Sequence, residues 1–72
     1  MDRGRAISLF KEMVTLGLVQ QSFVSVEKNK LGSFSLIIKP TGNTSDIRAF
    51  LSNKNLVISE NTEKGMCKIY KP

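Results

Sequence analysis

Residues 5–19 read RAISLFKEMVTLGLV, a segment in which a helical pattern passes through a glycine into an apolar run. Its apolar residues recur at the spacing of one helical face: Ile7, Phe10, Met13 and Val14. This spacing predicts a helix from about Arg5 to Leu16. Gly17 then supplies the residue type that most easily adopts the left-handed conformation at a helix end. The segment therefore predicts a helix, a glycine stop and the start of a strand.

Two strands are predicted downstream of this glycine. Residues 19–26 are rich in β-branched and aromatic types, and residues 33–39 alternate apolar with polar side chains except at Ile37. Between them, EKNKLG at 27–32 combines charge with turn-forming residues, which favours an antiparallel hairpin with a basic, solvated tip. Pro40 ends the second strand, because proline cannot donate a hydrogen bond to a sheet.

A second unit of the same order follows. A short helix is predicted from a capping candidate and an apolar face: Thr44 or Ser45, then Ile47, Phe50 and Leu51. Two further strands are predicted at 56–59 and 66–71, with a polar turn at 60–65 between them. The expected fold is a small two-layer α+β domain of αββ-αββ order with antiparallel hairpins. We expect a single domain over residues 1–72, with the units at 5–40 and 44–72.

Composition supports a folded domain with a basic surface. The chain has 72 residues, of which 40% are hydrophobic and 24% charged, as is usual for globular proteins. A formal net charge of +5 and a pI of about 9.7 favour a polyanionic partner. The single cysteine, Cys67, excludes an internal disulfide. No apolar run approaches the roughly 20 residues that span a bilayer, and the start lacks the apolar region of a signal peptide, so no membrane association is expected.

The residue types that enzymes need are scarce. Histidine is absent, which removes the usual general base near neutral pH and the commonest metal ligand. Cys67 lies in a predicted strand with no histidine to activate it, so a buried apolar role is expected. The one close carboxylate pair, Glu60 and Glu63, lies in the predicted turn and is expected to be solvated. We therefore expect no enzyme activity, no cofactor, no metal and no small-molecule substrate.

Basic and polar residues outside the predicted core faces indicate an RNA-binding surface. Phosphates are contacted by lysine and arginine, and hydroxyl, amide and backbone groups of a loop read RNA shape and 2′-hydroxyls. The predicted RNA-binding residues are Arg3, Arg5, Lys28, Lys30, Ser59, Asn61, Thr62, Lys64, Gly65, Lys68 and Lys71. The four phenylalanines are expected in the core, which leaves Tyr70 as the aromatic candidate for base stacking.

These residues also carry a resemblance to a known family. In the first unit they are ISLFKEM at 7–13, GLV at 17–19, Phe23, EKNK at 27–30, Gly32 and LII at 36–38. In the second unit they are FLSN at 50–53, LVIS at 56–59 and KGM at 64–66. Together they resemble the small-subunit ribosomal protein eight family, in the same order and over most of the chain.

The resemblance implies a structural role in the small ribosomal subunit, with rRNA and neighbouring ribosomal proteins as partners. In that family a loop contacts the central domain of the rRNA, which implies this role for Ser59, Lys64 and Gly65. Here ENTE at 60–63 stands where the family has a shorter serine and threonine pair, and its two carboxylates repel phosphate. The family's opening helix and strand, and much of the segment between its domains, have no counterpart. A reduced member of this kind is expected in a mitochondrial or other organellar ribosome, with the cytoplasm as the alternative.

Two other functions remain open on the sequence. The helix, glycine and basic hairpin could serve as the recognition helix and wing of a winged-helix-like DNA-binding regulator, although the preceding helices of that class are lacking. Alternatively, the strand at 33–39 could offer an exposed edge to a partner strand, as in a small protein-interaction module.

Overall fold

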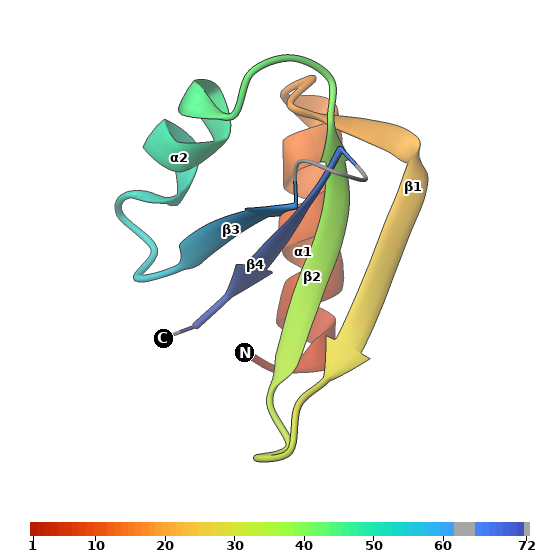
Figure 1. Ribbon diagram of the computed structural model, residues 1–72, viewed down its shortest axis with the longest axis vertical. Helices are drawn as coiled ribbons and strands as arrows, with labels where there is room; N and C mark the ends of the chain where they lie inside the picture. Colours follow the sequence, from red (N-terminus) through yellow and green to blue (C-terminus); the bar gives the residue numbers. More distant parts are fainter. Residues whose placement is uncertain (62–64, 72) are drawn as a thin grey trace.

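A computed structural model describes residues 1–61 and 65–71 of the chain. It contains two helices, α1 (Arg3–Thr15) and α2 (Ser45–Leu51). The four strands are β1 (Val19–Lys28), β2 (Phe34–Pro40), β3 (Val57–Asn61) and β4 (Met66–Tyr70). The order along the chain is αββ-αββ, and the α+β fold class predicted from the sequence is confirmed (Figure 1).

The strands form one antiparallel sheet in the order β1-β2-β4-β3. Each unit contributes a hairpin, and the two hairpins join where β2 pairs with β4. The strand predicted at 33–39 is therefore central, and the expectation that it offers an exposed edge was wrong. The apolar Ile37, which breaks the alternation of that strand, is half-buried on the side opposite Leu36, as suits a strand with neighbours on both sides. The free edges belong to β1 and β3.

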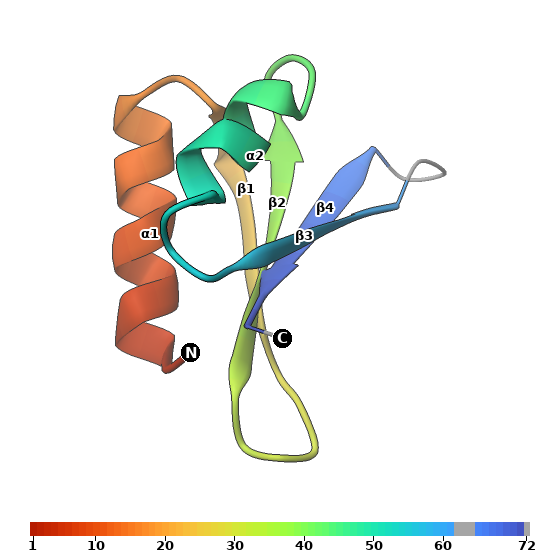
Figure 2. The same ribbon diagram turned by 90° about the vertical axis from the view of Figure 1, so that its left-hand side faces the viewer.

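Both helices cover the same face of the sheet, and among the described residues no helix covers its opposite face (Figure 2). One hydrophobic core lies between the two layers and contains residues of both units. Its buried members are Ala6, Leu9, Met13, Val19, Leu36, Ile38, Ile47, Leu51, Ile58, Cys67 and Ile69. Successive side chains of a strand point to opposite faces of the sheet. The residues that alternate with these buried ones along β2, β3 and β4 therefore lie on the face without helices, which we call the open face.

Helix α1 is rotated relative to the predicted apolar face. It buries Ala6, Leu9 and Met13, while Phe10 and Val14 pack at the border of the core. The small side chain at Ala6 allows the helix backbone to lie close to the sheet, which favours this face over the bulkier one. The four phenylalanines were expected inside the core, but all of them are only half-buried. Phe10 and Phe50 pack against the core from its border.

Local hydrogen bonds fix both ends of α1. It begins two residues earlier than predicted, because the Asp2 carboxylate caps it by accepting a hydrogen bond of 2.7 Å from the Arg5 backbone N–H. At the other end Gly17 has a φ of +74°, and the N–H of Leu18 donates to the carbonyl of Met13 at 2.9 Å. This is the Schellman arrangement, and it confirms the predicted glycine stop.

Helix α2 is tied to the edge strand β3. Thr44 is the N-cap residue, as predicted, but its hydroxyl donates to Glu60 Oε1 at 2.6 Å and does not cap the helix. Arg48 Nη2 contacts the other oxygen, Glu60 Oε2, at 3.1 Å. Glu60 therefore lies in β3 on the helix-covered face, next but one to Ile58. Its placement in a turn was wrong, whereas its side chain is exposed, as expected. The turn predicted at 60–65 starts later, after Asn61.

Candidate nucleic-acid interface

The open face of the sheet is defined by strand register. Antiparallel partners share a face, so Ser25, Ile37, Lys68 and Ser59 form one cross-strand row. The end of the sheet at which β1 turns into β2 is called the hairpin end. The next row toward it contains Glu27, Ser35 and the pair Tyr70–Val57. Serine hydroxyls, one lysine and one glutamate thus surround the half-buried Ile37 and Tyr70 and the exposed Val57. Neither helix covers them (Figure 2).

An ion pair crosses this face. Lys68 Nζ on β4 lies 3.5 Å from Glu27 Oε2 on β1, although β2 stands between the two strands. Both side chains remain about half exposed. Ser35, on β2 between them, is only 4% exposed. The lysine is therefore held across the sheet and still reaches solvent.

A hollow of about 310 Å³ lies at the hairpin end of the open face. Hydroxyl and amide groups line it together with two lysines and the tyrosine: Asn29, Ser33, Ser35, Ser59, Lys68, Tyr70 and Lys71. Tyr70 is half-buried, so part of its ring faces solvent. The hollow combines hydrogen-bonding groups, positive charge and an aromatic side chain, which are the groups that bind unpaired nucleotides.

A second hollow, of about 290 Å³, adjoins the first because Lys71 lines both. Its other lining includes Arg5 from α1, Lys54 from the segment after α2, and the Asp2 carboxylate. The Lys54 ammonium lies 4.7 Å from the centre of the Phe50 ring, a cation–π contact that restrains the side chain. We call Arg5, Lys54, Lys68, Tyr70 and Lys71 the basic shelf.

The N-terminus is fastened beside the basic shelf. The Met1 ammonium donates to the Ser33 hydroxyl at 2.8 Å, and the Phe34 N–H donates to the Met1 carbonyl at 2.8 Å. These bonds bring the start of α1 to the same end of the molecule as the end of β4 (Figure 1). Arg5 is thereby placed near Lys71, although the two are far apart in the sequence, and the Met1 ammonium adds positive charge.

The structure brings four of the predicted RNA-binding residues together on or beside the basic shelf: Arg5, Ser59, Lys68 and Lys71. Others lie apart. Arg3 faces a groove on the other side of α1, and Lys28 and Lys30 are exposed in and after the end of β1. Gly65 is exposed just before β4 with a φ of +63°, at the opposite end of that strand from Tyr70.

Three further predicted residues are Asn61, Thr62 and Lys64. The backbone of Asn61 pairs with Met66 at the end of β3, which corrects its placement in a turn. Thr62 and Lys64 lie outside the described residues. Lys54 was not predicted from the sequence, because only the fold brings it to the shelf. Tyr70 was predicted only as a residue on which a base could stack. The signal that the sequence offered for Lys54 was its position in the polar segment SNKN at 52–55.

The thiol of Cys67 is buried in the core, and this burial, followed by the charge of Glu60, raises its pKa. In residues 1–61 and 65–71 no three His, Cys, Asp or Glu side chains are grouped so that they could hold a metal ion. No helix in the described part of the chain is long and apolar enough to cross a membrane. The chemistry assembled on the shelf is that of anion and base contact.

Comparisons with protein-family models, with curated proteins and with solved structures found no match to this chain.

Proposed function

We propose that the protein acts by binding folded RNA through the basic shelf, without catalysis, as a structural constituent of a small ribosomal subunit. The observation that carries the proposal is that Lys68 and Lys71 line one hollow with the half-buried Tyr70, while Arg5 and Lys54 line the adjoining hollow with Lys71. Cations at several points contact successive phosphates, and the tyrosine ring offers a surface for an unpaired base.

Folded RNA fits the shelf better than duplex DNA does. The hollow at the shelf is lined by Ser59 together with Lys68 and Lys71, a set of groups suited to 2′-hydroxyls and phosphates of irregular RNA. We keep the DNA-binding regulator as the alternative that the experiment below tests.

The assignment to rRNA rests on the resemblance of both units to the small-subunit ribosomal protein eight family. Ser59, one of the residues to which that resemblance gives an rRNA contact, lines the shelf. We propose the central domain of small-subunit rRNA as the binding site, neighbouring ribosomal proteins as further partners, and a mitochondrial or other organellar ribosome as the location. Because RNA would bind only the folded chain, assembly would also stabilise its thin core.

The test is a competition measured by fluorescence anisotropy of a labelled central-domain rRNA fragment. We expect the purified chain to bind this fragment at low salt, and unlabelled fragment to displace it at lower concentration than duplex DNA of equal length does. Tyr70→Leu should weaken RNA binding by about five- to a hundredfold if a base stacks on the ring. Stronger competition by duplex DNA than by RNA would contradict the proposal and favour the regulator.

A further inference from the structure

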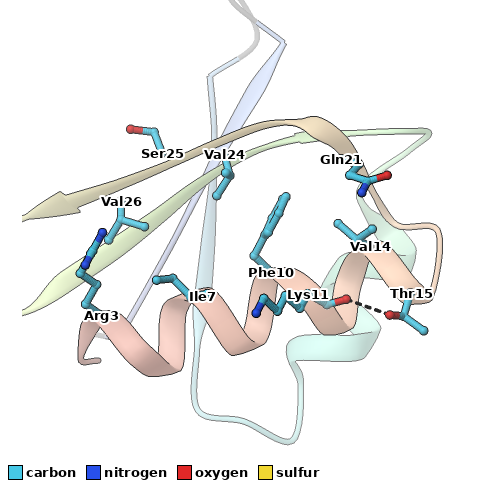
Figure 3. Close-up of a pocket in the computed structure, with 10 residues that line it drawn as sticks. All are labelled: Arg3, Ile7, Phe10, Lys11, Val14, Thr15, Gln21, Val24, Ser25 and Val26. Atoms are coloured by element: carbon cyan, nitrogen blue, oxygen red, sulfur yellow. Dashed lines mark hydrogen bonds between the residues drawn. The ribbon is translucent and has the colours of Figure 1, made fainter.

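A larger hollow lies between α1 and the edge strand β1, away from the basic shelf. It is a groove of about 760 Å³, and no residue of the shelf lines it. Ile7, Phe10 and Val14 form its wall on α1, and Val24 and Val26 form its wall on β1. Figure 3 shows the Phe10 ring directed from the helix toward the strand, near Val24.

The groove exists because α1 is rotated. With Ala6, Leu9 and Met13 turned to the core, the helix leaves its second apolar face half-buried at the border of the sheet. Val24, on the opposite wall, is 44% exposed. The apolar surface here is not completed by any other part of the described chain.

The strand beside this groove has a free edge. β1 pairs only with β2, in regular register from Val24 to Lys28. Between Val19 and Val24 the register shifts, so the strand is irregular there. The backbone of residues 24–28 can therefore accept another strand on its outer side, which would place alternate side chains of that strand over the groove.

The charged side chains that line the groove indicate what kind of strand it would bind. Arg3 and Lys11 line the groove, and no carboxylate does. The two lie eight positions apart on the helix, a rise of about 12 Å. A β-strand covers that distance in about four residues, and residues i, i+2 and i+4 share a face. A strand with carboxylates at i and i+4 and an apolar side chain at i+2 would thus match Arg3, the Phe10 region and Lys11.

We propose that this groove binds an extended segment of a partner protein, with an acidic–x–apolar–x–acidic pattern, which adds a strand to the edge of β1. A second copy of the chain is not the partner: no Asp or Glu in the sequence is followed by another four residues later, and the net charge of +5 opposes self-association. Nucleic acid is disfavoured because the groove is mainly apolar. The inference stands on different residues from the RNA-binding proposal and does not depend on it.

The test uses the full chain and a labelled synthetic peptide that alternates threonine with glutamate, isoleucine and glutamate. Binding is measured by anisotropy at 150 mM salt, with two control peptides: one with lysine for glutamate, and one with the isoleucine moved next to a glutamate. We expect only the patterned peptide to bind, with amide chemical-shift changes centred on residues 24–28. Equal binding of the shifted-isoleucine peptide, or shift changes centred on the shelf, would overturn the proposal.

Three variants test the geometry. Arg3→Gln together with Lys11→Gln should weaken peptide binding about three- to tenfold, since each exposed ion pair contributes only modestly. Val24→Glu should weaken it further, because it places a negative charge in the groove. The exposed Lys39→Gln is the control and should leave binding unchanged. All variants should keep the wild-type circular dichroism spectrum; unchanged peptide binding in both groove variants would contradict the assignment.

Discussion

Lys68 and Glu27 are joined across the sheet, with the Lys68 ammonium 3.5 Å from a carboxylate oxygen of Glu27. The pair links β4 to β1 over the intervening β2 on the open face. A phosphate that binds at the basic shelf would compete with this carboxylate for the lysine. The ion pair therefore restrains the lysine, and in the proposed complex it would lower the affinity of that lysine for RNA.

Replacing this carboxylate should strengthen RNA binding. In Glu27→Gln the lysine no longer has an anionic partner, so we expect about two- to fivefold tighter binding of an rRNA fragment at low salt. Stability should change by less than about 1 kcal/mol, because the pair is half exposed. Anisotropy titration and urea unfolding measure the two effects. Weaker RNA binding by this variant would show that Glu27 itself contributes to the interface.

The contact between α2 and β3 should make stability depend on pH. The Thr44 hydroxyl, and then Arg48, lower the pKa of Glu60. A carboxylate whose pKa is lower in the folded chain contributes stability above its ordinary pKa, and loses it as the pH falls through its folded value. Glu60→Gln should therefore lower the Tm at pH 7, and the difference from wild type should shrink below about pH 4.

The control for this effect is Thr44→Val, which removes the hydrogen bond that lowers the pKa most. It should raise the pKa of Glu60, measured by NMR titration of the side-chain carboxyl carbon, and move the loss of stability to higher pH. A Tm difference for Glu60→Gln that is the same at pH 7 and at pH 3 would contradict the role given to this carboxylate.

Gly17 should not be replaceable without a loss of stability. Its φ of +74° is costly for any residue with a Cβ, so Gly17→Ala should destabilise the chain by about 1–2 kcal/mol. Gly42 is the matched control, because open space surrounds it and its φ lies outside the left-handed region. Gly42→Ala should be nearly neutral. Urea unfolding of the two variants checks the contrast, and equal losses would argue against the Schellman stop.

Cys67 should react slowly in the folded chain. Burial first, and the Glu60 charge second, raise the pKa of its thiol, so little reactive thiolate is present at neutral pH. Alkylation by iodoacetamide at pH 7.5 should be much slower than in denaturant, followed by mass spectrometry. Equal rates in the two conditions would mean that the strand pairing of β4 with β2 and β3 does not protect this side chain.

The order of elements was predictable because local signals set it. Gly17 stops the first helix, the charged segment at 27–32 makes the first hairpin, and Pro40 ends its second strand. The rotation of α1 was not predictable, since both of its faces are apolar. Which face is buried depends on the close packing of Ala6 against the sheet, and that is a tertiary effect.

Of the candidate site, only some of the positively charged residues could be predicted from the sequence. Arg5, Lys68 and Lys71 stand out in the sequence as cations outside the core pattern. Tyr70 joins them through the pairing of β2 with β4, and Lys54 joins them because it lines the same hollow as Arg5 and Lys71. Sequence periodicity specifies which residues face outward, but not which outward residues from different elements meet.

The most direct test of RNA binding at the basic shelf is the salt dependence of RNA affinity in two matched double variants. Lys54→Gln with Lys71→Gln removes two shelf cations, and Lys11→Gln with Lys39→Gln removes the same charge elsewhere. We predict that the shelf variant lowers the slope of log affinity against log salt by about 1.5, as the loss of two phosphate contacts requires, while the control keeps nearly the wild-type slope. Equal slopes for the two variants would contradict the shelf as the RNA-binding surface.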